Sequence, residues 1–510
     1  MSENHSEDSN GEGEKAKLNN IRTELWLFLQ LAIPTTILNL GFIVSPLLTA
    51  SHIGRTFEPA FLSGFTLANL TGNLCTFSLM SGLFGAADTL GPQAFGAGKK
   101  KEVGLIALRG FACAICLLLP ISLILVFYIK DILIALGQDE EASKHASEWY
   151  RIYVLSFPFN ITYMAIWKFL SAQHVMKPLI MASIPSCAVV LPLALDVLTE
   201  SFGFVGSALA YVVFQAFQAL FLIVYLWWKK PYEDGTWPGI ECWREAIFQY
   251  KPMKEYIHLG IGGMFAQSEW IFWEALGLII GLLGVVPLSV HTIPNQVTML
   301  LCLAPFSAGT ALTIRMGSTL PIDVSHAKRI AVVCVLLTVA VFSVVNFVAY
   351  ISSDWIIGLF TNDEDVTELA NAIWWKVCIF NVSVATFGAL TGVANGLGMQ
   401  WTLAGVNIFW LWVVGLPAIY YMAYVREGGV ESAWSWINYP YVGMNSCLIA
   451  AYAMTNWYQI ADKIQKEEVM HPPVYLGHMM ENFERAPLIN STNENTKSKQ
   501  YGSDFQEQGI

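Results

Sequence analysis

A series of long apolar runs is the feature that most constrains what this chain can fold into. Only 13% of its 510 residues are charged and 55% are hydrophobic, which excludes an ordinary soluble domain. Each run is about as long as the roughly 20 residues that cross a bilayer as a helix. We therefore expect an all-α polytopic membrane protein with about twelve transmembrane helices. They lie at roughly 24–50, 60–86, 103–130, 148–172, 177–197, 203–228, 256–284, 288–312, 328–352, 369–394, 401–424 and 432–457.

Charged residues in the short connections predict the orientation of the chain. Basic residues gather after even-numbered runs, as at 99–101 and 229–230, whereas acids gather after odd-numbered runs, as at 139–141 and 363–365. Because basic loops stay on the cytoplasmic side, both termini are expected in the cytoplasm. The net charge of -11 then reflects the tails and the outer loops, and it does not indicate a nucleic-acid partner.

The two halves of the sequence repeat each other. GQDEEASKHA from residue 137 matches TNDEDVTELA from residue 361, and AADTLGPQAFG from residue 86 matches TALTIRMGSTL from residue 310. Each half holds an even number of runs, which predicts two six-helix lobes related by a pseudo-two-fold axis along the membrane normal, around a central cleft. The expected parts are a disordered cytoplasmic tail (1–22), an N-terminal lobe (23–230), a cytoplasmic inter-lobe loop (231–255), a C-terminal lobe (256–458) and a second cytoplasmic tail (459–510).

The seventh run carries two acidic side chains at membrane depth, within residues 257–283. Glu269 lies near its middle and Glu274 follows five residues later, which turns the second carboxylate about 140° away from the first. A carboxylate in hydrocarbon is costly unless it faces a cavity or a partner, so each is either a functional group or a hydrogen-bonding link between helices. Trp270 and Trp273 lie beside them. Because Trp273 shares a helix face with Glu269, indole and carboxylate together could attract a lipophilic cation.

The eighth run adds further polar candidates. His291 is either a group that titrates near neutral pH or a packing residue, and Asn295 and Gln296 either line the cleft or link helices. The nine cysteines are scattered without metal-binding spacing, and no HExxH motif or Ser/His pair occurs at membrane depth. We therefore expect no metal, no cofactor and no enzymatic activity.

Several motifs together carry a resemblance to a known family. They are GAADTLGPQAFGAGK after the second run, LAIP in the first, EWIFWE in the seventh, VGSALA at 205–210 and TIRMGSTL after the eighth. The chain resembles the multidrug and toxic compound extrusion family, eukaryotic branch, over about residues 25–460. This resemblance implies a secondary antiporter that exports organic cations, xenobiotics or secondary metabolites in exchange for protons, with sodium the less favoured coupling ion.

The resemblance also implies roles for particular residues. Glu269 matches the essential acid of the family's EWWxxE motif, and Glu274 matches its second glutamate. Asn69 and Thr71 match a polar patch in the second helix, which would contribute to the same transport site.

A signature loop is implied after the second helix. Asp88, Gln93 and Gly96 match this loop, and Arg315 occupies a nearly equivalent end of the second lobe. The alternative is that Asp88 and Arg315 only cap helix ends and hold loop geometry.

The chain also departs from the family pattern. Ile271 replaces a tryptophan, Gly262 replaces a proline, and Gln296 and Val384 stand where animal members carry acids. No Asp or Glu occurs from residue 25 to 51, so the first-helix aspartate of prokaryotic relatives is absent. These departures favour coupling through the second lobe and put the animal-type cation pocket in doubt.

The C-terminal tail contains ERAPLI, which resembles an acidic dileucine sorting signal formed by Glu484, Leu488 and Ile489. Such a signal implies contact with clathrin adaptors and a vacuolar or lysosomal membrane, with the plasma membrane as the rival. The expected partners are otherwise a small organic cation or metabolite and the lipid bilayer, and we expect a monomer.

Other functions compete with an antiporter. A lipid-linked flippase of the same superfamily would need a cationic cleft for phosphate, whereas the charges at membrane depth are acidic. A channel would need a continuous polar lining, which the runs do not contain.

Overall fold

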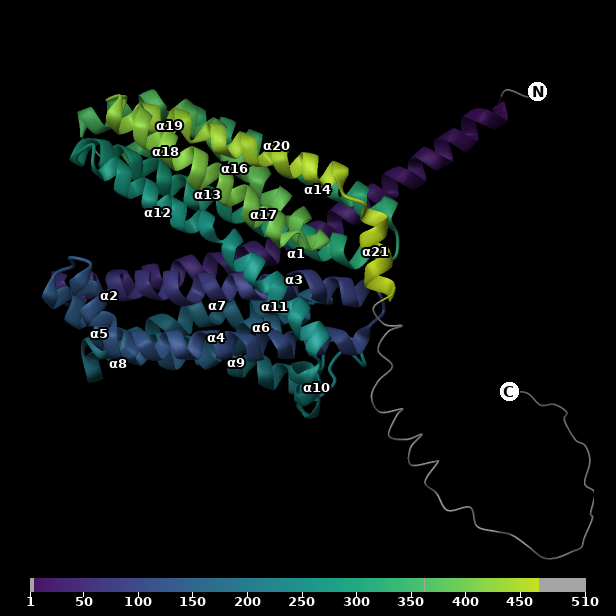
Figure 1. Ribbon diagram of the computed structural model, residues 1–510, viewed down its shortest axis with the longest axis horizontal. Coiled ribbons are helices and arrows are strands. Elements are labelled where there is room, and N and C mark those ends of the chain that lie inside the picture. Colours follow the sequence, from purple (N-terminus) through teal and green to yellow (C-terminus); the bar gives the residue numbers. More distant parts are fainter. Residues whose placement is uncertain (1–3, 362, 467–510) are drawn as a thin grey trace, which may run out of the picture. The chain divides into compact units, whose positions relative to one another are not determined.

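The computed structural model of the protein describes residues 4–361 and 363–466, and all the secondary structure in these residues is helical (Figure 1). Eight helices among them are long and apolar enough to cross a membrane. Six of the eight are continuous and two contain π-helical turns. The continuous ones are α1 (Asn4–Thr56), α4 (Lys100–Ala135), α9 (Phe204–Lys229), α13 (Val285–Thr319), α14 (Val324–Ile351) and α16 (Glu364–Leu397). The interrupted ones are α7 (Lys177–Pro185), η3 (Ser186–Val190) and α8 (Leu191–Phe202), and then α17 (Gln400–Asn407), η5 (Ile408–Gly415), α18 (Leu416–Tyr420) and η6 (Tyr421–Val425).

Four further spans are each built from consecutive shorter helices. In chain order they are α2 (Pro59–Gly72), η1 (Asn73–Phe77) and α3 (Ser78–Gly96); α5 (Glu140–Tyr153), η2 (Val154–Ser156) and α6 (Phe157–Ala172); α11 (Tyr250–Ala266) and α12 (Ser268–Gly281); α19 (Gly429–Trp436) and α20 (Asn438–Met454). With the eight long helices they complete the twelve-span arrangement that the apolar runs predict. Shorter helices fill the connections: η4 (Ile240–Cys242), α10 (Trp243–Phe248), α15 (Ser353–Gly358) and, after the last span, α21 (Trp457–Lys466).

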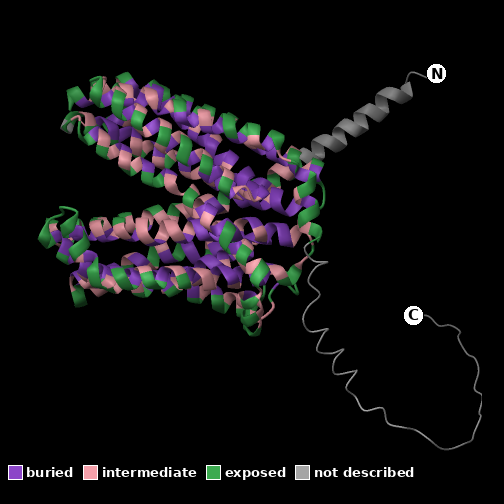
Figure 2. Ribbon diagram, viewed as in Figure 1, coloured by how far each residue is buried: buried purple, intermediate pink, exposed green. Residues whose placement is uncertain are grey.

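The spans pack as two lobes, one formed by α1 to α9 and the other by α11 to α20 (Figure 1). Residues up to Ile464 belong to one compact unit. Buried residues lie where the helices of each lobe face one another and where the two lobes meet, and exposed residues lie on the outward faces (Figure 2). Large apolar side chains such as Phe127 and Leu278 are exposed, as expected for helices that lie against lipid.

The lobes are joined toward one end of the bundle, which we call the α21 end because α21 lies there (Figure 1). Thr89 donates to the carbonyl of Asn395 at 2.6 Å, and Gln93 donates to the carbonyl of Gly396 at 2.8 Å. Further pairs join the lobes between the middle of the bundle and this end, namely Asn39 with Ser307, Thr89 with Gln400, His174 with Ser318, and Glu24 with Arg315. The lobes are therefore closed against each other at the α21 end, where the basic loops predict the cytoplasm.

A close approach of two glycines brings α11 against the first lobe. A Cβ atom on Gly263 would lie 2.2 Å from the carbonyl oxygen of Gly82 in α3, so only glycine fits there. The α11 helix ends at Ala266, and the amide of Gln267 is shared between the carbonyls of Gly263 and Met264. The following helix, α12, packs against elements of the second lobe. The seventh span is thus interrupted just before Glu269.

Helical segments also occur in the expected tails and in the inter-lobe loop. The α1 helix begins at Asn4, within the expected N-terminal tail 1–22. The loop 231–255 contains η4 and α10, and buried Arg109 holds it by donating to the carbonyl of Ala246. The C-terminal tail begins with the amphipathic helix α21.

Candidate functional site

Glu269 lies in the first turn of α12 and its residue is only 6% exposed. The break at Gln267 places this carboxylate at a helix N-terminus in the middle of a membrane span. Free backbone N–H groups and the helix dipole at such an end favour a negative charge. The chain therefore buries an acidic group at a break in the span.

Two side chains form a hydrogen-bonded chain with this carboxylate. The Tyr441 hydroxyl of α20 donates to Oε1 of Glu269 at 2.6 Å, and the Trp273 indole N–H donates to the Tyr441 hydroxyl oxygen at 3.2 Å. Within the described residues, Oε2 of Glu269 has no hydrogen-bond partner, and Glu269 lines a pocket. One oxygen is thus held by protein, and the other is available to a ligand.

The pocket beside Glu269 spans about 280 Å³, a volume that includes space open to solvent. Its lining is Glu269, Trp270, Trp273, Thr298, Met299, Cys302, Phe306 and Val384, from α12, α13 and α16. Glu269 is the only carboxylate among these residues, and the Thr298 hydroxyl is engaged by the amide oxygen of Asn381 at 2.7 Å. A cation that enters would meet two indoles and one acid, which is the chemistry of aromatic recognition of organic cations.

The structure separates the other predicted residues of the second lobe from this pocket. Glu274 is exposed and does not line it, consistent with its different direction on the helix. Asn295 is half-buried with an unpartnered amide oxygen, one turn of α13 away from Thr298, and Gln296 is exposed. His291 is buried with its ring 5.6 Å from that of Trp434.

The predicted polar patch of the first lobe is not in contact with Glu269. Asn69 and Thr71 are half-buried in α2, and the Thr71 hydroxyl donates to the carbonyl of Leu67 in its own helix. No described residue of the first lobe lines the pocket.

The predicted signature loop is helical, which corrects its assignment as a loop. Asp88, Gln93 and Gly96 all lie in α3, which continues to residue 96. The charge of Asp88 is compatible with a buried helix because Lys168 of α6 pairs with it at 2.8 Å. A Cβ atom on Gly96 would collide with the carbonyl of Ser318, so this end of α3 lies directly against the second lobe.

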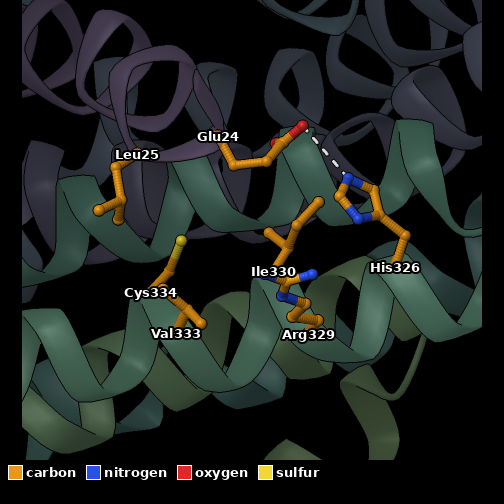
Figure 3. A pocket seen from close by; sticks show the side chains of 7 residues that line it. All are labelled: Glu24, Leu25, His326, Arg329, Ile330, Val333 and Cys334. Carbon is orange, nitrogen blue, oxygen red and sulfur yellow. Dashed lines mark hydrogen bonds and ion pairs between the residues drawn. The ribbon is translucent and has the colours of Figure 1, made fainter. Parts of the chain in front are cut away.

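Arg315 joins the lobes rather than capping its own helix. Its guanidinium pairs with Glu24 of α1 at 2.6 Å, and His326 of α14 contacts the other carboxylate oxygen at 3.2 Å. Glu24, His326 and Cys334 line a second pocket of about 270 Å³ between α1 and α14 (Figure 3). We call Glu24, Arg315 and His326 the α1 clamp.

Sequence reasoning missed Tyr441 and Glu24. Tyr441 lies 172 residues from Glu269, and nothing around it in the sequence marks it as the partner of an acid. Glu24 stands one residue before the acid-free stretch that begins at Leu25, at the start of the first apolar run, and nothing in the sequence marks it as a buried group. The sorting residues Glu484, Leu488 and Ile489 lie outside the described residues.

No group of three or more His, Cys, Asp or Glu side chains within residues 4–361 and 363–466 could hold a metal ion. Two lobes of apolar helices, closed against each other at one end, with an acid-bearing pocket at membrane depth, define a multi-span membrane transporter.

Comparison with known proteins narrows that class. The MatE family model matches residues 34–198 and 266–421, and the chain belongs to this family of multidrug and toxin extrusion transporters. "Multidrug and toxin extrusion protein 2" of Oryctolagus cuniculus is 29% identical over 426 residues, which cover 81% of this chain and 68% of that protein. "Multidrug and toxin extrusion protein 1" of Rattus norvegicus is 26% identical over 447 residues, 86% of this chain and 77% of that protein.

The fold is likewise similar to solved structures. The crystal structure of the eukaryotic MATE transporter AtDTX14 superposes with a TM-score of 0.77 at 22% identity, covering 87% of this chain and 99% of that one. The two-lobe, twelve-span architecture is therefore that of the family.

Proposed function

We propose that this transporter is a secondary active antiporter, which exports organic cations, xenobiotics or secondary metabolites in exchange for protons by alternating access. The observation that carries the proposal is Glu269, a single buried carboxylate in a pocket of aromatic, sulfur-containing and aliphatic walls. A carboxylate in such surroundings is stable when it either carries a proton or pairs with a cation. Proton and substrate therefore compete for one group.

This competition couples the two movements without a separate switch. A cation that enters from the cytoplasm displaces the proton from Glu269, and a proton that enters from the far side displaces the cation. Trp270 and Trp273 would hold the organic part of the substrate through their ring faces, while Glu269 holds its charge.

A proton fits this pocket better than a sodium ion does. Hard cations are held by several oxygen ligands at once. Only two of the pocket-lining residues, Glu269 and Thr298, carry side-chain oxygens, which is few for a hard cation. A proton needs one carboxylate oxygen only, and Oε2 of Glu269 supplies it.

The distribution of contacts between the lobes supports alternating access. The lobes are linked at the α21 end by the α1 clamp and by the hydrogen bonds of Thr89 and Gln93. These links lie at one end of the bundle, so breaking them as a set would open that side. The state described is then the one in which the predicted cytoplasmic side is closed.

The test is uphill export of ethidium, a fluorescent organic cation, from proteoliposomes under an imposed proton gradient, with sodium varied independently. The rate of export should depend on the proton gradient and should not change with the sodium concentration. Glu269→Gln keeps the shape of the side chain but fixes it neutral, so export should fall to that of empty liposomes. Glu269→Asp should retain part of the wild-type export, because the carboxylate charge remains on a shorter side chain.

Glu274→Gln is the matched control for this test. It removes a carboxylate from the same helix, but one that is exposed and outside the pocket, so export should change little. Uphill export by Glu269→Gln at normal protein levels would overturn the proposal. Export that follows an imposed sodium gradient would overturn the choice of proton.

A further inference from the structure

Tyr441 is fully buried between two side chains of α12, to which it makes hydrogen bonds of opposite direction. An indole N–H can only donate, so the Tyr441 hydroxyl oxygen must accept from Trp273. The single proton of the hydroxyl is then directed to Oε1 of Glu269, 2.6 Å away. Trp273 therefore fixes the direction in which Tyr441 donates.

The position of the Tyr441 ring is fixed by packing. Phe380 and Phe387 of α16 meet it edge to face, with ring centroids 4.9 Å and 5.8 Å away. A ring held in this way cannot follow the carboxylate if Glu269 moves. Tyr441 itself does not line the pocket, so a ligand beside Glu269 reaches the phenol only through the carboxylate.

We propose that Tyr441 is a positioning residue that favours the ionised form of Glu269, and so sets the pH range over which a cation can displace the proton. The inference rests on the proposed function. A hydrogen bond donated to a carboxylate stabilises the charged form relative to the neutral one, and in a buried site this effect is strong. The helix N-terminus of α12 acts in the same direction, while burial opposes both.

Few other ionisable groups face Glu269 from the elements packed against α12. Cys302 of α13 lines the same pocket, and His291 of α13 lies against Trp434 instead. Glu431 of α19 is paired with Lys376 of α16 at 2.8 Å. The described residues of α17 and η5 carry no ionisable side chain, α18 carries only exposed Tyr420, and the nearest such group of α11 is His258. Tyr441 is thus the hydrogen-bond donor through which the site can be adjusted.

The test is the pH dependence of ethidium binding to the purified full-length protein, measured by fluorescence polarisation. Tyr441→Phe keeps the ring and removes the donated hydrogen bond, so Glu269 should hold its proton to higher pH. The midpoint of the binding curve should then rise by about one to two pH units. Tyr452→Phe is the matched control, because Tyr452 lies in the same helix, is buried, and donates to the carbonyl of Leu390. Its midpoint should stay at the wild-type value.

Trp273→Phe provides a second variant that leaves the Tyr441 hydroxyl in place. Loss of the directing N–H should raise the midpoint by less than Tyr441→Phe does, and the change of pocket lining should also weaken ethidium binding at all pH values. If Tyr441→Phe is too unstable to purify, the midpoint of Trp273→Phe decides, and an unchanged value there overturns the inference.

The outcomes separate this inference from the proposed function. If Glu269→Gln abolishes uphill export but Tyr441→Phe leaves the midpoint unchanged, Tyr441 is only a packing residue and the antiporter proposal stands. If Glu269→Gln still exports uphill, the proposed function is wrong, whatever the Tyr441 variant does.

Discussion

Breaking the α1 clamp should open the α21 end of the transporter. Glu24 makes two contacts to the Arg315 guanidinium, at 2.6 Å and 3.2 Å, and a third to His326. The side chains of Arg315 and Glu24 are only 14% and 17% exposed, so solvent screens the pair weakly. Glu24→Gln keeps the size of the side chain and removes its charge.

The size of the effect follows from the charged hydrogen bonds that this substitution weakens. A hydrogen bond to a charged group contributes about 1.5–3 kcal/mol, and Glu24→Gln should cost the closed state roughly that amount. Because 1.4 kcal/mol is a tenfold change in an equilibrium, the ratio of open to closed protein should rise roughly 10- to 100-fold. The change acts on the separation of the lobes and not on the core of either lobe.

Cys334 can report this opening. Its residue is 2% exposed and lines the pocket between α1 and α14 that the clamp borders (Figure 3). In a background where the other cysteines are replaced, a membrane-impermeant maleimide should label Cys334 faster in Glu24→Gln than in the wild type.

Asp88→Asn is the control for this measurement. The Asp88–Lys168 pair has similar burial, at 16% and 10% exposed, but it lies within the first lobe. It should not increase labelling of Cys334. Equal labelling rates in Glu24→Gln and Asp88→Asn would refute the idea that Glu24 holds the lobes together.

Three further predictions concern pH, packing and sorting. Burial lowers the pKa of His174, in the connection between α6 and α7, to about 4. In the unfolded chain the imidazole has a pKa of about 6.5, so as pH falls the unfolded state binds a proton before the folded state does. The stability that is present above pH 6.5 should therefore drop by about 2 kcal/mol at pH 5. Thermal unfolding should show this loss in the wild type, and an equal loss in His174→Asn would contradict the assignment to His174. Gly309→Ala places a Cβ atom 2.2 Å from the carbonyl oxygen of Gly388 and should cost about 1–3 kcal/mol, whereas Gly277→Ala, with open space around it, should unfold like the wild type. Leu488→Ala with Ile489→Ala should move a fluorescently tagged protein from an acidic compartment to the cell surface, and unchanged localisation would discard the sorting signal.

The sequence predicts the spans well because a bilayer imposes one strong requirement on them. Runs of apolar residues show in any window, and an acid inside such a run, such as Glu269, is visible without any structure. The apolar pattern places the end of the second span too early, near residue 86, because Asp88 and Gln93 look like loop residues. Their partners, Lys168 and the carbonyl of Gly396, come from elsewhere in the chain and make helix possible there.

The partners of the site are the part that sequence patterns could not supply. Tyr441 is an ordinary residue inside the last membrane span, and only the fold brings its hydroxyl to Glu269. Asn295 and Gln296 are polar and close in sequence to Thr298, yet the helix turns Gln296 outward and carries Asn295 one turn beyond the pocket. Polarity identifies residues that need a partner, but not which partner they find.

The interruption of the seventh span at Gln267 divides it into two helices, and we call the connection at Gln267 the joint. The first helix, α11, packs against α3 of the first lobe through Gly263 and Gly82, and the second helix, α12, packs within the second lobe. Because α11 also packs against α17 of the second lobe, rocking that changes its contact with α3 would act on this joint, two residues from Glu269. We expect the angle of the joint, and with it the distance from Glu269 to the rigid Tyr441 ring, to differ between the two states of the transport cycle. The movement of the lobes and the affinity of Glu269 for a proton would then change together.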